Sequence, residues 1–127
     1  MTASTERWEE QARYDLSTAR AMLDSGRYLY VLFCCQQAIE KALKAVIVNR
    51  TGEFPPRLHN LPRLSETAGL SPDSECRGFL GELTAYYIQT RYPEGVEFTD
   101  TSDAPEVADE TLRRTEEVAE WLFSMIE

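Results

Sequence analysis

The sequence predicts an all-α protein, an up-and-down bundle of four long helices and one short helix. Apolar residues recur at intervals of three and four along four long stretches, the periodicity of a helix with one buried face. No run with the alternating pattern of a strand occurs, and proline and glycine are sparse. A chain of 127 residues with 43% hydrophobic content is large enough to bury a core, so we expect residues 1–127 to form a single domain.

The first two helices are expected over residues 5–25 and 28–49. The first has Ser4 or Thr5 as its cap and Gly26 at its end. The second, YLYVLFCCQQAIEKALKAVIVN, is the most apolar stretch of the chain and should lie at the centre of the bundle. Because only a few residues separate them, the two helices should pack as an antiparallel hairpin. The polar residues of the second helix are expected on the face opposite its apolar stripe: Gln36, Gln37, Glu40, Lys41 and Lys44.

Three further helices are expected after the pair Pro55-Pro56, which forces an extended connection. Leucine spacing predicts a short helix that closes at Gly69, and Ser71-Pro72-Asp73 is typical of the start of a fourth helix. A loop over residues 91–102 leads to Asp103, the expected cap of the last helix. The apolar face of that helix is predicted to comprise Val107, Thr111, Val118, Leu122 and Met125.

Charge is unevenly distributed along the chain. The net charge of −9 lies in residues 94–127, which hold eleven acidic residues and two arginines. By contrast, residues 41–63 carry five basic residues against Glu53 alone. An acidic protein is a poor non-specific binder of nucleic acid, because phosphate contacts need a positive field. The local basic segment leaves open a surface for one nucleotide or a short strand, and a solvated face of mixed charge is the alternative.

The cysteine and histidine content argues against a metal site or a disulfide framework. The three cysteines, Cys34, Cys35 and Cys76, have no zinc-binding spacing, and His59 is the only histidine. No glycine-rich phosphate loop or nucleophile motif is present. We therefore expect reduced, buried thiols, no metal and no cofactor. The N-terminus is polar and the longest apolar run, residues 28–35, is far shorter than the ~20 residues of a membrane span, so we expect a soluble, cytoplasmic protein with no membrane contact.

Six polar residues are candidates for ligand binding: Gln37, Lys41, Lys44, His59, Arg91 and Tyr92. Lys44 follows Glu40 by four residues, in the order that favours a surface ion pair, so a structural role is the alternative for it. His59 stands before a predicted helix, where a hydrogen bond that caps or pins that helix is the alternative to proton transfer. Arg91 either meets the dipole of the helix that it ends or presents a planar fork to phosphate, with Tyr92 as a stacking face.

Four segments of the sequence carry a resemblance to a known family. They are Trp8, Ala12, Asp15, Leu16 and Ala19, followed by Gly26-Arg27-Tyr28; FCCQQAIEKALKA at residues 33–45; Pro55-Pro56 with His59 and Leu61; and Tyr87 with Arg91-Tyr92-Pro93. With these segments the chain resembles the HEPN domain, a helical domain named for higher eukaryotes and prokaryotes nucleotide-binding. The resemblance spans residues 8–93, and the acidic last helix matches only as a closing helix.

The resemblance implies a four- to five-helix up-and-down bundle that commonly dimerises. Many prokaryotic members of the family are encoded beside a minimal nucleotidyltransferase and act with it. Others are metal-independent ribonucleases, including toxins of toxin–antitoxin pairs, whose signature is an arginine, four to six residues and a histidine. This chain lacks the signature, because eight residues separate Arg50 from His59, one separates Arg57 from it, and no histidine follows Arg91.

The leading hypothesis is a HEPN protein that binds a nucleotide or a short RNA feature as a homodimer and acts with a nucleotidyltransferase partner. One alternative is an enzyme, a ribonuclease toxin that uses a non-standard set of residues. The other is a non-enzymatic interaction module, which docks a partner protein through its acidic last helix or an exposed apolar surface. In that last case, charge reversal at Glu116, Glu117 and Glu120 should abolish complex formation.

Overall fold

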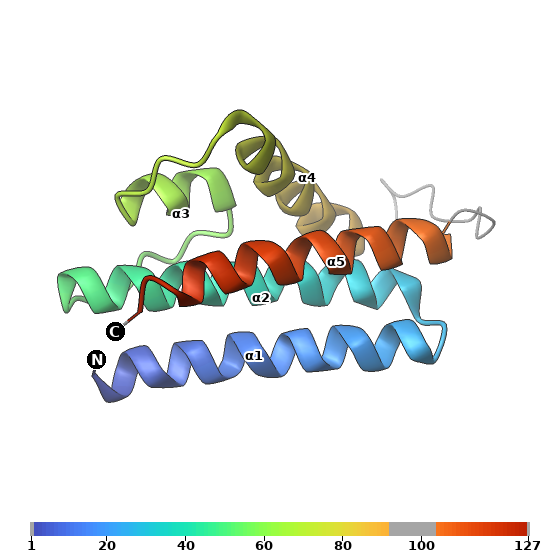
Figure 1. The fold of residues 1–127 in the computed structure, drawn as a ribbon, viewed down its shortest axis with the longest axis horizontal. Coiled ribbons are helices and arrows are strands. Elements are labelled where there is room, and N and C mark those ends of the chain that lie inside the picture. Colours follow the sequence, from blue (N-terminus) through green and yellow to red (C-terminus); the bar gives the residue numbers. More distant parts are fainter. Residues whose placement is uncertain (1, 92–103, 127) are drawn as a thin grey trace.

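A computed structural model describes residues 2–91 and 104–126 of the chain. These residues form five α-helices and no strand: α1 (Ala3–Asp24), α2 (Tyr28–Thr51), α3 (Leu61–Thr67), α4 (Ser74–Arg91) and α5 (Ala104–Phe123). Helices α1, α2 and α5 run side by side, while α3 and α4 lie on the opposite side of α2 from α1 (Figure 1). The prediction of an all-α fold with four long helices and one short helix is confirmed. None of the described helices combines the length and apolarity that crossing a membrane requires.

Helix α2 is the centre of the fold and contacts each of the other four helices. Most of its apolar residues from Val31 onward are buried as predicted, and they include Cys34 and Cys35, whose thiols are free. The predicted polar face of α2 is wrong, however. Gln36, Glu40 and Lys44 are at most 6% exposed, because the segment that leads into α3 covers the side of α2 on which they lie.

The sequence predicted the type of residue that caps α1 and α4, but the cap of α1 lies a few residues from the predicted position. Helix α1 is capped by Thr2, whose hydroxyl accepts the Thr5 N–H, and not by Ser4 or Thr5. Asp73 caps α4 by accepting the Cys76 N–H at 2.8 Å. Local side-chain chemistry marks a helix start without fixing which of two neighbouring hydroxyl or carboxyl residues adopts the cap geometry.

The end of α2 and both ends of α3 show the residue preferences usual for helix termini, glycine after the last turn and asparagine as the N-terminal cap. Helix α2 ends at Gly52 with φ of +69°, and the turn after α3 contains Gly69 with φ of +76°. Both backbones are left-handed, a conformation that glycine adopts without a Cβ clash. Asn60 caps α3 by accepting the Arg63 N–H at 3.0 Å.

The predicted apolar face of α5 is partly wrong. Thr111 and Leu122 are buried as expected, but Val107 is 40% exposed. The buried face also contains residues with small or medium side chains that were passed over: Ala108, Leu112, Thr115 and Ala119. Small residues let α5 approach α2 closely, so the largest apolar side chains were a poor guide to its inner face. The expected cap Asp103 and the loop residues from 92 onward lie outside the described residues.

Candidate functional site

A buried polar network occupies one face of α2. Gln36, Glu40 and Lys44 are spaced four apart, so their side chains follow one another along the same side of the helix. Gln36 Nε2 donates to Glu40 Oε1 at 3.0 Å, and Lys44 Nζ donates to Glu40 Oε2 at 3.1 Å. The ion pair between Glu40 and Lys44 is therefore present as predicted. Its expected position at the surface is wrong, because both side chains are less than 10% exposed.

His59 joins this network from the extended segment after Pro55-Pro56. Its Nδ1 lies 2.9 Å from Glu40 Oε1, and its backbone carbonyl accepts from Gln36 Nε2 at 3.3 Å. His59 thus pins its segment to α2, and the cap of the following helix is the neighbouring Asn60. The His59 ring also stacks on Tyr87 of α4, with centroids 4.4 Å apart and planes 16° apart. Nearly half of the His59 side chain, 47%, remains exposed.

Glu40 is the carboxylate that orients the histidine. Burial alone raises the pKa of Glu40, but the hydrogen bonds from His59 and Gln36 and the charge of Lys44 outweigh it, so the pKa lies below its ordinary value. An ionised carboxylate only accepts hydrogen bonds, so His59 Nδ1 must carry the proton that it shares with Glu40. In the neutral ring the lone pair then sits on Nε2, the nitrogen that does not face Glu40.

Helix α1 closes the far side of the network. Lys44 Nζ lies 5.6 Å from the centroid of the Trp8 ring, a cation–π distance. Lys41 points to another part of α1, where its Nζ is 2.9 Å from Asp15 Oδ2. Asp15 Oδ2 has no partner with hydrogen-bond geometry, so this contact is an ion pair without an aligned hydrogen bond. Both lysines among the candidate residues are therefore matched by a carboxylate.

The other candidate residues occupy three different environments. Gln37 is partly exposed and donates to Gln36 Oε1 at 2.6 Å, which extends the network toward solvent. Arg91 is the last residue of α4, one helical turn after Tyr87, and its side chain lies outside the described part of the structure. Tyr92 lies outside the described residues altogether. The structure thus gathers Gln37, Lys44 and His59 into one network and holds Lys41 apart.

The local basic segment does not form one continuous positive surface. Lys41 and Lys44 have carboxylate partners, and Arg50 donates to the Ala68 carbonyl at 2.8 Å, where it supports the end of α3. Arg57 and Arg63 are exposed and make no ion pair with any described residue. Any positive field on this side of the protein therefore comes chiefly from these two arginines and from Arg50, whose charge a neutral carbonyl does not cancel.

The described residues offer no other chemistry of the kinds considered from the sequence. No group of three or more histidine, cysteine or acidic side chains within residues 2–91 and 104–126 is arranged to hold a metal ion. Burial raises the pKa of Cys34 to about 11, with Asp15 adding to the effect, and raises that of Cys35 to about 12. Both thiols are protonated at neutral pH, which makes them poor nucleophiles.

Three important residues of the network were missed as site residues. Gln36 and Glu40 were placed on the solvent face of their helix, and Tyr87 was used only as a marker of family resemblance. The spacing of four between Gln36, Glu40 and Lys44 could have indicated one polar row. Nothing in the local sequence around Tyr87 could have shown that it stacks on a ring 28 positions earlier.

Comparison with known proteins agrees with this architecture. No curated protein matches the chain. The crystal structure of TT1696 from Thermus thermophilus is similar to 98% of this chain and 100% of that chain, with a TM-score of 0.83 and 26% identity. The crystal structure of ST0689, an archaeal HEPN homologue, is similar over 100% of both chains, with a TM-score of 0.78 and 26% identity. The family model of the HEPN domain matches residues 5–125, and the chain therefore belongs to the HEPN domain family.

Proposed function

We propose that this HEPN protein binds a nucleotide or a short RNA feature at the surface formed by His59 and Tyr87, and that it does so without cleaving the ligand. The observation that carries the proposal is the geometry of His59. Its ring is held on one side by buried Glu40 and on one face by Tyr87, while 47% of the side chain stays exposed. A side chain fixed in this way is preorganised for a ligand, because little conformational entropy is left to lose.

The chemistry of the surface suits a nucleotide. A stacked pair of aromatic rings offers edges and faces to a base, and stacking is a common mode of recognition of unpaired bases. His59 Nε2 accepts a hydrogen bond from a hydroxyl or amino group in the neutral ring, and donates one to phosphate when it carries a proton. Arg91 follows Tyr87 by one helical turn, and we propose that it supplies a planar fork to phosphate, with Tyr92 as a further stacking face.

The remaining candidate residues support the site from behind. Lys44 is paired with Glu40, so we propose that it neutralises the carboxylate that orients His59 and does not touch the ligand. Gln37 bonds to the same network and lies at its solvent edge. Lys41 is 22% exposed in its side chain, and we propose that it reaches a phosphate only by exchanging its contact with Asp15.

We also propose that the protein acts as a homodimer with a nucleotidyltransferase partner, as the family resemblance suggests. Exposed apolar residues support an interface at one end of the bundle. Tyr30 near the start of α2, Ile88 near the end of α4 and Val107 near the start of α5 are all at least 40% exposed. These three helix ends lie at the same end of the molecule (Figure 1). Light scattering should give twice the mass of the chain, and Ile88→Lys should shift the population toward monomer.

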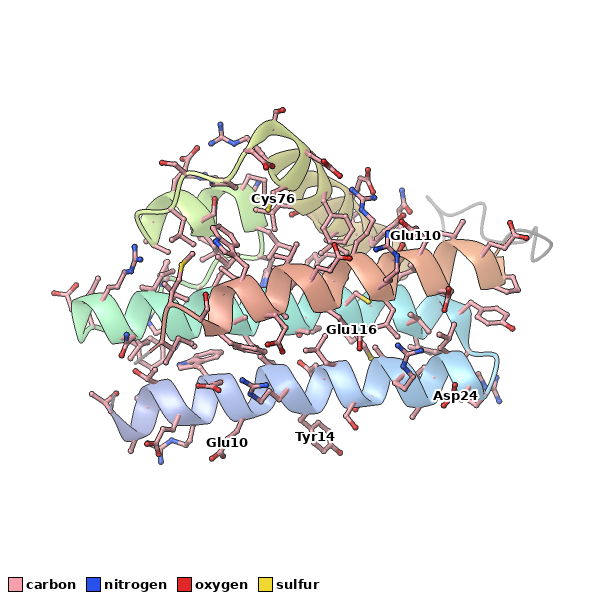
Figure 2. All side chains as sticks on the ribbon, in the orientation of Figure 1. Glu10, Tyr14, Asp24, Cys76, Glu110 and Glu116 are labelled. Atoms are coloured by element: carbon pink, nitrogen blue, oxygen red, sulfur yellow. The ribbon has the colours of Figure 1, made fainter. Side chains whose placement is uncertain are left out.

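Calorimetry with nucleoside triphosphates and a short single-stranded RNA tests ligand binding. We expect His59→Ala and Tyr87→Leu each to weaken binding about tenfold or more, because stacking on one aromatic ring contributes about 1–3 kcal/mol. Tyr14→Leu is the matched control. Tyr14 is 73% exposed on the outer edge of α1, away from the other helices (Figure 2), so this change should leave the affinity intact.

Two results would refute nucleotide binding at this surface. One is the absence of measurable heat with every nucleotide and RNA at about millimolar concentration, which corresponds to a binding free energy weaker than about −4 kcal/mol. The other is an unchanged affinity in Tyr87→Leu. Circular dichroism of each variant confirms that its helices are intact.

One observation favours a ribonuclease as the second candidate function. Because His59 Nδ1 is hydrogen-bonded to Glu40, the lone pair of the neutral ring is on Nε2, which does not face Glu40. Nε2 can therefore take the proton of a ribose hydroxyl as a general base. RNA that stays intact after long incubation with the purified protein would dispose of this candidate. Cleavage that His59→Ala abolishes would establish it, and relief of growth arrest by Arg91→Ala would extend it to a toxin.

A further inference from the structure

A groove runs between the first half of α4 and the second half of α5. It consists of two adjoining hollows of about 420 and 460 Å³, which share the lining residues Asp73, Cys76, Glu117 and Val118. The groove lies on the side of α5 away from α1. Figure 2 shows Cys76 and Glu110 on that side, whereas Glu116 lies on the opposite side of α5, next to α1.

The floor of the groove is apolar. It comprises Phe79, which is buried, together with the partly exposed side chains of Cys76, Val118 and Trp121 and of Pro72 at the end nearest the turn before α4. No helix among the described residues covers this strip of α5. The exposed floor is thus formed by apolar side chains from both helices, Cys76 of α4 and Val118 and Trp121 of α5, together with Pro72.

The rim of the groove is acidic. Asp73, Glu75, Glu110 and Glu117 surround the floor, and all four residues are exposed. The two basic residues of the lining are already paired. Arg113 contacts Glu110 and Glu117 at 2.6 Å each, and Arg114 contacts Glu82 at 3.4 Å while its guanidinium lies 4.2 Å from the centroid of the Phe79 ring. The groove therefore presents an excess of carboxylates around an apolar floor.

We infer that this groove docks a basic, amphipathic segment of a partner protein, whose apolar side chains fill the floor and whose lysines or arginines meet the rim. Charge complementarity selects this occupant. An acidic rim repels nucleic acid, and it also repels the acidic last helix of a second copy; the homodimer interface proposed above involves a different surface, around Tyr30, Ile88 and Val107. The lining of α5 extends from Glu110 to Trp121, about 17 Å at 1.5 Å per residue, which corresponds to about three turns of a docked helix.

This surface is distinct from the His59 site, so the inference goes beyond the proposed binding of nucleotides. It also changes the expectation that Glu116, Glu117 and Glu120 act together in docking. Glu116 pairs with Arg20 at 3.1 Å and Glu120 lies 4.0 Å from Arg13, so both face α1. Of the three glutamates, only Glu117 lines the groove.

A synthetic peptide of leucine and lysine provides the probe. It should be about 15 residues long, or four helical turns, with its leucines at helical spacing on one face. Trp121 lies in the groove and reports binding by its fluorescence once the other tryptophan is removed with Trp8→Phe. Saturable binding with a shift of the Trp121 emission is expected. A peptide of the same composition with its leucines scattered around the helix should bind about tenfold more weakly, because it cannot fill an apolar floor.

Matched variants decide whether the groove is the binding surface. Val118→Lys, in the floor, should weaken peptide binding about tenfold or more, whereas Tyr14→Lys, on the exposed outer edge of α1, should leave the affinity unchanged. Removing two rim charges with Glu75→Gln and Glu117→Gln should weaken binding about threefold or more. The control with the same net charge is Glu6→Gln with Glu10→Gln, on the exposed side of α1.

Three results would overturn the inference. One is the absence of saturable peptide binding. Another is equal weakening by groove and control variants, which would mean that the peptide binds the overall negative charge. The third is a concentration-dependent dimer that Val118→Lys dissociates, which would mean that a second copy covers the groove. If Val118→Lys lowers the melting temperature, the variant of the exposed pair Glu75 and Glu117 decides the question, because neither residue contributes to the core.

Discussion

The ion pair of Glu40 and Lys44 makes a quantitative prediction about stability. Each side chain is less than 10% exposed, and Glu40 also accepts hydrogen bonds from Gln36 and His59. Removing one member of a buried pair leaves an uncompensated charge and costs about 3–5 kcal/mol. Glu40→Leu and Lys44→Met should each lose about this much. Domains of this size have total stabilities of about 5–15 kcal/mol, so either change should lower the melting temperature by roughly 10–20 °C.

The double variant should be far more stable than the sum of the two single losses. With both charges gone, the apolar replacements remove the desolvation cost of the pair. Two hydrogen-bond donors, from Gln36 and His59, then lose their acceptor, at about 1 kcal/mol each. We therefore expect Glu40→Leu with Lys44→Met to lie only about 1–3 kcal/mol below the parent, with a coupling of several kcal/mol between the two positions.

Urea denaturation followed by helix circular dichroism measures all four proteins of this cycle, and equal m-values confirm that the same surface unfolds in each. The exposed pair of Glu66 and Arg77, which are 2.9 Å apart and more than half exposed, is the control. The corresponding cycle of Glu66→Leu and Arg77→Met should show a coupling below about 1 kcal/mol. Losses at Glu40 and Lys44 that add to within about 0.5 kcal/mol would refute the reasoning.

Three further predictions concern single features of the fold. Burial alone would raise the pKa of Glu40, but the hydrogen bonds from His59 and Gln36 and the charge of Lys44 outweigh it and hold the pKa below its ordinary 4.5. The contribution of Glu40 to stability is therefore complete above pH 4.5, and it is lost as the pH falls through the lower pKa of the folded state. The stability difference between the parent and Glu40→Gln should therefore narrow as the pH falls below 4.5 in urea titrations, and a difference that widens there would contradict the assignment. Ellman's reagent should modify only Cys76 in the folded protein, and slowly, because burial and the charges of Asp73 and Glu75 raise the pKa of its thiol; Cys34 and Cys35 should react only on unfolding, and three reactive thiols in the folded protein would contradict their burial. Gly52→Ala should cost about 1 kcal/mol by thermal denaturation, because φ is +69° with open space around the Cα, and no loss would mean that the end of α2 relaxes easily.

The sequence predicts the helices well because their signals are local. For α2, both signals are found in the helix itself or directly after it: the spacing of the apolar residues in Tyr28–Thr51, and the glycine at which the helix ends. The predictions fail where a distant segment decides the outcome. Glu40 and Lys44 have the spacing of a surface pair, and they are buried because a segment that begins eight residues after Lys44 folds back over them. No property of α2 alone distinguishes the two cases.

In the candidate site, too, residues with a local signal could be predicted and residues that depend on distant contacts could not. His59 and Lys44 could be selected because an isolated histidine and a lysine in an apolar helix are conspicuous in the sequence. Their partners could not be selected, since Tyr87 reaches His59 from α4 and Trp8 reaches Lys44 from α1. Contacts between residues this far apart in the chain depend on how the helices cross, which periodicity does not specify.

The composition of the network bears on whether it serves stability or a ligand. A buried ion pair adds little to stability relative to apolar residues of similar volume, so a core that needed only to fold would do as well with Leu and Met at these positions. What apolar residues could not do is hold the His59 ring through its Nδ1. If the double variant of Glu40 and Lys44 keeps most of its stability but loses affinity for nucleotides, the network positions His59 for a ligand. If stability and affinity are both retained, His59 is held by Tyr87 and its backbone alone, and the carboxylate has no part in the site.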